Sequence, residues 1–151
     1  MNPRPNPKID TDHAIASLNA LLRSEHSAVE SYEHAIAKLG VEAPEELSNC
    51  LRSHRQRVQR LTVRISALGG VPAASSGIWI ALTKLVEDGT AVFTRKSALA
   101  IIEEREDQGL TQYGDRLASL DNESRRLVET ELLPEQRTTH TTIRSLSLAT
   151  A

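Results

Sequence analysis

The chain has 151 residues, enough for one domain with a core of its own, and its formal net charge is only -2. This charge excludes a general attraction to nucleic acid or to an anionic membrane. Aromatic residues make up 3% of the chain, so Leu, Ile, Val and Ala must supply the core, as in helix–helix packing. The single Cys50 cannot form an internal disulfide. No apolar run is long enough to cross a bilayer and no signal-peptide core follows Met1, so we expect a cytoplasmic protein.

The N-terminal residues 1–12 hold three of the six prolines. We expect them to form a flexible arm before a single helical domain over residues 13–151. Asp12, or one of the two residues before it, is predicted to cap a first helix that runs to Leu39. Gly40 follows as a left-handed stop.

A second helix is predicted to begin at Pro44, because proline suits a first turn, and to end at the glycine pair that starts at Gly69. A long connection then reaches to about Lys96. It contains a short apolar helix, at about residues 77–86, with the only tryptophan, Trp79. More apolar residues cluster there than one buried face needs, so we expect this helix both to cap the bundle and to form part of a dimer surface.

A third helix is predicted from about Thr94 to Leu120, followed by a short turn with a good cap at Asp121. The fourth helix contains Pro134, which is expected to kink it or to mark the start of a second helical piece. Short loops after the first and third helices give two antiparallel hairpins, and the long connection between them permits a crossover. The predicted fold class is therefore all-α, a four-helix bundle.

One polar residue interrupts the apolar stripe of each long helix. In chain order these residues are Glu25, His54, Glu106 and His140. Such stripes pack into the interior of a bundle, where a polar group is costly unless it is paired or bound to a metal. The only two tyrosines, Tyr32 and Tyr113, each lie seven residues after one of the glutamates. This repeat predicts two related hairpins that bring the four polar residues to one shared interior site.

Two carboxylates and two imidazoles can ligate one divalent iron, manganese or zinc ion, and two ionised Glu with two neutral His balance its charge. Tyr32, Tyr113 and Gln136 would then surround the ligands as hydrogen-bonding partners. The same side chains can instead form a metal-free network of Glu–His pairs, completed by the tyrosine hydroxyls. A third reading is that some of these side chains do not face the interior. The residues alone leave all three readings open.

The segment LLRSEHSAVESYEHAI, with Glu25, resembles the first helix of ferritin-like proteins, where such a glutamate is an iron ligand. EEREDQGLTQY, with Glu106, resembles their third helix, and His54 and His140 fall where the histidines of two Glu-x-x-His motifs would lie. LGGVPAASSG, followed by the helix with Trp79, resembles a bacterial branch of that superfamily, the domain of unknown function 2383 family. The resemblance implies a ferritin-like bundle with a long crossover, and a role in metal handling or the stress response.

One departure from the family pattern limits this resemblance. In the di-iron members, a Glu three residues before each His binds both metal ions, but these positions are Leu51 and Arg137 here. Leucine cannot coordinate a metal, and arginine adds a fixed positive charge. We therefore do not expect a full ferroxidase centre, and enzymatic activity stays undecided.

The second helix also carries a stripe of basic residues. These are Arg52, Arg55, Arg57, Arg60 and Arg64. Glu103, Glu104 and Asp107 of the third helix are available as partners, so we expect salt bridges within or between chains rather than contacts to nucleic acid. We expect a homo-oligomer, a dimer or larger. The alternative to a metal-binding function is a non-catalytic interaction or structural protein with a metal-free polar core.

Overall fold

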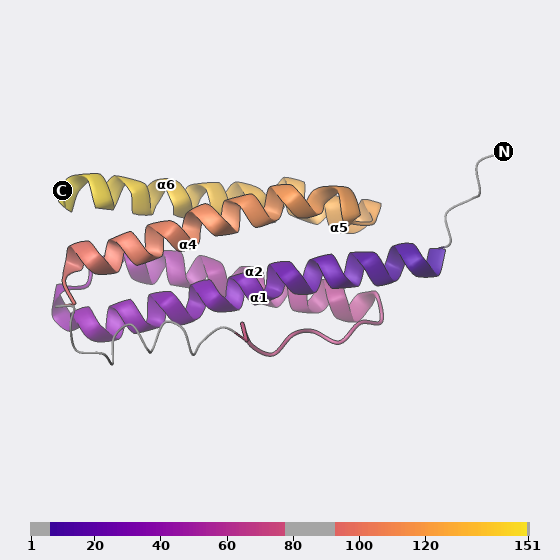
Figure 1. Cartoon of the computed structure of the whole chain (residues 1–151), viewed down its shortest axis with the longest axis horizontal. Helices are drawn as coiled ribbons and strands as arrows, with labels where there is room; N and C mark the ends of the chain where they lie inside the picture. Colours follow the sequence, from indigo (N-terminus) through magenta and orange to yellow (C-terminus); the bar gives the residue numbers. More distant parts are fainter. Residues whose placement is uncertain (1–6, 78–92, 151) are drawn as a thin grey trace.

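The computed structural model describes residues 7–77 and 93–150, and these residues form helices joined by short turns, without a strand (Figure 1). Four long helical segments lie side by side. They are α1 (Pro7–Leu39), α2 (Glu45–Ala67), α4 (Arg95–Arg116) and α6 (Leu133–Thr150), with a short α5 (Asn122–Leu127) and three further turns of helix, η1 (Gly40–Glu42), η2 (Leu117–Ser119) and η3 (Val128–Leu132). The predicted all-α four-helix bundle is confirmed.

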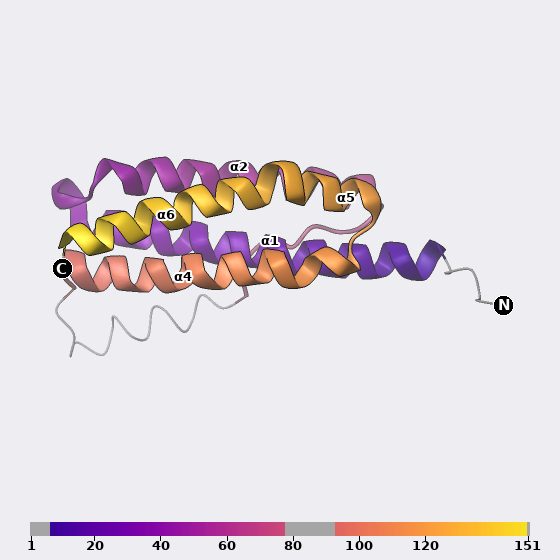
Figure 2. The ribbon, with the colours of Figure 1, turned by 90° about the horizontal axis from the view of Figure 1, so that it is seen from above.

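The long helices form two antiparallel hairpins, α1 with α2 and α4 with the helical run that ends in α6 (Figures 1 and 2). α1 also packs against α4, whereas α2 and α6 touch each other less extensively. Figure 1 shows α2 and α4 running in the same direction, so the end of α2 and the start of α4 lie at opposite ends of the bundle.

The first helix is longer than the sequence predicted. α1 begins at Pro7, before the predicted cap near Asp12, because proline suits the first turn and Asp10 lies favourably at the positive end of the helix. Part of the predicted arm is therefore helical, while residues 1–6 lie outside the described residues. α1 ends at Leu39 as predicted, and Gly40 follows with a φ of 56°.

The second helix ends as its glycines predicted. Gly69 has a φ of 83°, and its amide donates to the carbonyl of Ser66 at 3.0 Å. The amide of Gly70 donates to the carbonyl of Ile65 at 2.9 Å, which completes a Schellman motif. The predicted short helix around Trp79 lies outside the described residues.

The segment that follows α2 lies along α1. The side chain of Asn19 accepts a hydrogen bond from the amide of Ala73 at 2.8 Å, and His26 donates to the carbonyl of Ala73 at 2.9 Å. One helical turn further along α1, Ser76 donates to the carboxylate of Glu30 at 2.7 Å. Residues 71–76 therefore travel back along the bundle, toward the end where α4 begins.

The second hairpin has well-defined helix starts. Thr94 caps α4 in a reciprocal capping box with Ser97, and Asp121 caps α5 by accepting from the amide of Ser124 at 3.3 Å. The π-helical turn η3 then leads into α6, which begins at Leu133 and so places Pro134 in its first turn. The boundary at Leu133 agrees with the prediction that Pro134 marks a second helical piece, and the missing proline amide accompanies the change from π-helical to α-helical spacing.

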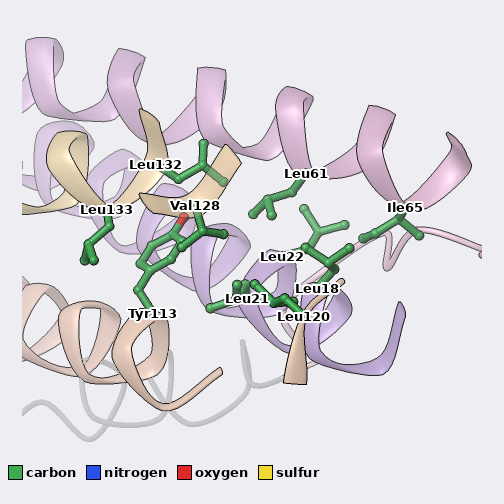
Figure 3. Packing of buried hydrophobic residues seen from close by; sticks show 10 residues of the cluster. All are labelled: Leu18, Leu21, Leu22, Leu61, Ile65, Tyr113, Leu120, Val128, Leu132 and Leu133. Carbon is green, nitrogen blue, oxygen red and sulfur yellow. The ribbon is translucent and has the colours of Figure 1, made fainter. Parts of the chain in front are cut away.

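The apolar core consists of two clusters along the bundle. One cluster, shown in Figure 3, contains Leu18, Leu21, Leu22, Leu61, Ile65, Tyr113, Leu120, Val128, Leu132 and Leu133. The other contains Tyr32, Ala35, Leu39, Leu47, Cys50, Leu51, Ala98, Leu99, Ile102 and Ile143. Buried polar side chains from all four long helices lie between these two clusters. Within the described part of the chain, no helix has both the length and the apolar character needed to cross a bilayer.

Candidate functional site

The buried polar layer is built around four ionisable side chains. Glu25 comes from α1, His54 and Arg57 from α2, and Glu106 from α4. Their exposed fractions are 3%, 1%, 0% and 1%, respectively, so solvent reaches none of them freely. Three of the four residues predicted to share an interior site are therefore brought together.

His54 bridges the two glutamates. Its Nδ1 donates to Oε2 of Glu25 at 2.6 Å, and its Nε2 donates to Oε1 of Glu106 at 2.8 Å. Burial alone would lower the pKa of His54, but the charge of Glu25 and the hydrogen bonds to both carboxylates raise it above its usual 6.5. Both ring nitrogens face a glutamate oxygen, so the geometry and the raised pKa together favour the protonated ring, with each nitrogen donating to one carboxylate.

The two tyrosines cross between α1 and α4. Tyr32 of α1 donates to Oε1 of Glu106 at 2.6 Å, and Tyr113 of α4 donates to Oε1 of Glu25 at 2.6 Å. Burial and the neighbouring carboxylates raise the pKa of both hydroxyls well above the usual value, so both remain protonated donors. This reciprocal pair of bonds fixes how far α1 and α4 are displaced along each other.

Arg57 supplies the second positive charge. Its Nη1 lies 3.5 Å from Oε1 of Glu25 and donates to Oε1 of Gln136 at 2.5 Å, while its Nη2 donates to the hydroxyl of Thr139 at 3.3 Å. The same Nη2 lies 2.9 Å from Nδ1 of His54. Because that nitrogen carries a proton, this is a close approach of two cations, which only the adjacent carboxylates can stabilise.

Two neutral residues of α6 complete the coordination of Glu106. Gln136 donates from Nε2 to Oε2 of Glu106 at 2.8 Å and to its main-chain carbonyl at 3.0 Å, and Thr139 donates to Oε2 at 2.9 Å. Gln136 reaches this position because it packs on Gly109 of α4. A Cβ atom added at Gly109 would lie 2.8 Å from Nε2 of Gln136.

The charges of the layer sum to zero, with two carboxylates against one imidazolium and one guanidinium. Burial alone would raise the pKa of Glu25, but the charges of Arg57 and His54 and the hydrogen bonds from His54 and Tyr113 bring it below its usual 4.5. A balanced set of this kind avoids the large cost of an uncompensated buried charge.

His140 does not belong to this layer, so the prediction that it shares the interior site is wrong. Its side chain is 15% exposed, and its Nε2 donates to Asp107 at 2.6 Å at the surface. The face of α6 that points inward carries Gln136, Thr139 and Ile143 instead. Thr139 lies three residues after Gln136, and His140 lies four residues after it. Either spacing keeps a side chain on the same face of a helix, so the sequence pattern could not distinguish the two. In the structure Thr139 occupies the inner position.

The sequence analysis missed the ion pair between Arg57 and Glu25. It placed Arg57 in a basic stripe on the second helix and expected the charge of Arg137 beside the site. In the structure Arg57 is fully buried and Arg137 is exposed. Arg57 lies three residues after His54, and residues so spaced share one face of a helix. That spacing is the signal that could have identified it.

The rest of the basic stripe is largely ion-paired, but with different helices from those predicted. Arg55 pairs with Glu33 of α1 at 2.6 Å, and Arg64 pairs with Asp121 at 2.8 Å. Arg60 pairs with Glu135 of α6. None of these three bonds reaches the acidic residues of α4.

The remaining predicted positions near the site are apolar in character. Leu51 is buried in one of the two apolar clusters, where it packs as an ordinary core residue. Cys50 is buried beside Tyr32, and burial raises the pKa of its thiol to about 11. A protonated buried thiol of this kind packs as a small apolar group and is a poor nucleophile.

The donor atoms that a metal ion would use are already committed to one another. Both nitrogens of His54 face carboxylate oxygens, and Arg57 supplies a positive charge at the same place. Within residues 7–77 and 93–150, no group of three or more His, Cys, Asp or Glu side chains is arranged to hold a metal. In this arrangement the residues do not fit a metal ion, which could bind His54 only if a ring nitrogen gave up its hydrogen bond to a glutamate. Metal binding by Glu25, His54, Glu106 and His140 stays a prediction.

Comparison with known families identifies the chain by its sequence. The family described as Domain of unknown function (DUF2383) matches residues 13–119. The chain belongs to this family. The match covers α1 from residue 13 onward and all of α2 and α4, and therefore includes both glutamates, both tyrosines, His54 and Arg57. Neither the curated proteins nor the solved structures gave a match to the chain.

Proposed function

We propose that this member of the DUF2383 family is a ferritin-like helical bundle with a metal-free polar core, and that it acts as a non-catalytic interaction or structural protein. The observation that carries the proposal is the double hydrogen bond of His54, whose two ring nitrogens both face glutamate oxygens next to Arg57. This arrangement leaves the carboxylates saturated and electrically balanced.

The directions of the helices support the ferritin-like part of the proposal. Two antiparallel hairpins with α2 and α4 running in the same direction require a connection that returns along the bundle (Figure 2). The bonds from Asn19, His26 and Glu30 of α1 to residues 71–76 support such a return. A single long crossover of this kind is typical of ferritin-like bundles.

The charges support the metal-free part. A divalent ion between two glutamates needs neutral imidazole, but both ring nitrogens of His54 face glutamate oxygens, and the raised pKa of His54 favours the protonated ring. Arg57 would add a further positive charge within 3.5 Å of Glu25. The guanidinium and imidazolium together thus provide the two positive charges that a divalent ion would otherwise bring.

Metal loading tests this proposal directly. Purified protein is incubated anaerobically with Fe²⁺, Mn²⁺ or Zn²⁺, desalted and subjected to elemental analysis. We expect far less than one ion per chain, and a melting temperature that chelators leave unchanged. One ion per chain that is lost in Glu106→Ala, but kept in the control Glu103→Ala on the same helix, would establish a metal-handling function instead.

A combined apolar replacement tests the structural role of the core. Changing Glu25, His54, Arg57 and Glu106 together to Leu removes every charge of the layer. The variant also carries Tyr32→Phe, Tyr113→Phe, Gln136→Leu and Thr139→Val, so that no buried donor loses its partner. We expect it to remain helical with equal or higher stability. Its oligomeric state, measured by sedimentation, should match that of the wild type if the surface carries the function. Self-association itself stays a prediction from the sequence.

A further inference from the structure

A polar groove lies between α1 and α4, outside the buried layer. Its volume is about 590 Å³, and its walls include Arg23, Ser24 and Ser27 from α1 and Arg105, Gln112 and Arg116 from α4. This volume is in the range of small-molecule binding sites, which commonly measure roughly 300–1,000 Å³. All of its lining residues except Ala20 are polar or charged, and none of them belongs to either apolar cluster.

The groove has an excess of positive charge. Three guanidinium groups, those of Arg23, Arg105 and Arg116, line it against one carboxylate, Asp107. Asp107 is already hydrogen-bonded to His140 at 2.6 Å. Arg105 donates to the neutral Gln108 at 2.9 Å, and no ion pair within the described residues involves any of the three arginines.

Two of these arginines lie close together along the bundle. The crossed bonds from Tyr32 to Glu106 and from Tyr113 to Glu25 set the antiparallel alignment of α1 and α4. In that alignment Arg23 lies within about one helical turn of Arg116. Asp107 is nine residues before Arg116 on the same helix, or roughly 13 Å away at 1.5 Å per residue, so its carboxylate lies toward the other end of the groove.

We propose that this end of the groove binds a small phosphate-bearing molecule, held between Arg23 and Arg116. Guanidinium groups bind phosphate oxygens through two parallel hydrogen bonds, and two of them on facing helices can grip one phosphate from both sides. The hydroxyls of Ser24 and Ser27 and the amide of Gln112 line the same groove and offer neutral donors. A bound anion also relieves the repulsion between the two guanidinium groups. This site is independent of the proposed metal-free core.

Calorimetric titration with inorganic pyrophosphate tests the site, at low ionic strength because such contacts are screened by salt. The wild type should bind one pyrophosphate per chain. Arg23→Gln and Arg116→Gln should each weaken binding by about tenfold, which corresponds to the loss of one charge-assisted interaction. Arg144→Gln, which removes an exposed arginine of α6 outside the groove, should leave binding unchanged.

Three binding results would overturn the proposal. They are the absence of saturable pyrophosphate binding, an equal loss of binding in Arg144→Gln, and tighter binding of a single-stranded RNA oligonucleotide that depends equally on all exposed arginines. Amide chemical-shift changes on pyrophosphate addition should centre on Ser24 and Gln112. Shifts confined to α6 would also contradict the site. Circular dichroism confirms that each variant keeps the wild-type helix content, because Arg23 is exposed and Arg116 only partly buried.

Discussion

The two helical hairpins contribute equally to one part of the buried layer and unequally to the other. α1 and α4 each supply one glutamate and one tyrosine, and each tyrosine donates to the glutamate of the opposite helix at 2.6 Å. α2 supplies both cations, His54 and Arg57, whereas α6 supplies only neutral donors and acceptors. The internal repeat of the sequence is thus retained in one helix pair and lost in the other.

This difference indicates where the layer depends on charge and where it depends on hydrogen-bond geometry. The α2 side neutralises two buried carboxylates, so losing a charge there exposes the full desolvation cost of its partner. The tyrosines of α1 and α4 and the two polar side chains of α6 are neutral donors to these carboxylates, and losing one such donor costs less than losing a buried charge. Four predictions follow this order of expected effect.

Arg57→Met should cause the largest loss of stability. It removes one of two buried cations and leaves two carboxylates with His54 alone, so we expect the free energy of unfolding to fall by about 3–5 kcal/mol. Urea unfolding followed by circular dichroism measures this change. Arg52→Met, an exposed position on the same helix, is the control and should stay within about 0.5 kcal/mol of the wild type. Similar losses in both variants would contradict the role of α2.

Stability should also pass through a maximum with pH. Glu25 has a folded pKa below 4.5, so its contribution is present above pH 4.5 and is lost as the pH falls through the folded value. His54 has a folded pKa above 6.5, so its contribution is present below pH 6.5 and is lost as the pH rises through the folded value. We expect less destabilisation than in Arg57→Met, because every side chain stays in place.

Urea unfolding across a pH series measures this profile. The loss of stability on the alkaline side should disappear in His54→Gln and persist in His140→Gln. An unchanged alkaline loss in His54→Gln would show that another group causes it.

Tyr32→Phe and Tyr113→Phe should destabilise the protein by similar amounts. Each removes one hydrogen bond to a buried carboxylate, which is worth roughly 1.5–3 kcal/mol. The double variant, compared with the two single variants by urea unfolding, measures their coupling through His54, which bonds to both glutamates. A large effect of one tyrosine with none of the other would show that the repeat is not retained energetically.

His140→Gln should have the smallest effect. Its bond to Asp107 lies at the surface, and exposed pairs contribute about 0–1 kcal/mol. Thermal unfolding should therefore show a shift of at most a few degrees. Thr139→Val, one residue earlier and buried against Glu106, should lower stability more than His140→Gln. The opposite order would return His140 to the interior site.

Much of the fold could be predicted from local signals. Gly40, Gly69 and Pro134 have strong conformational preferences, and the helix ends they mark agree with the structure. Glu25 and Glu106 were identified because a polar residue in an apolar stripe is conspicuous. The start of α1 was predicted too late, because Asp10, which could cap a helix, is equally acceptable inside a first turn that begins at Pro7.

The composition of the site was harder to predict. A three-residue and a four-residue step both keep a side chain on one helix face, so spacing could not choose between Thr139 and His140. Arg57 was assigned to the surface because arginine is seldom fully buried without a partner, and its partner Glu25 lies 32 positions away in the sequence. Pairing of this kind depends on tertiary contacts that periodicity does not contain.

The attachment of residues 71–76 to α1 has a consequence for any exchange of parts between two copies of the chain. Domain swapping requires a hinge, and a hinge before Ser76 would break the contacts to Asn19, His26 and Glu30 at once. A hinge C-terminal to Ser76 would let the second hairpin be exchanged with these contacts intact, whereas an earlier hinge would require them to form again on the first helix of the other copy.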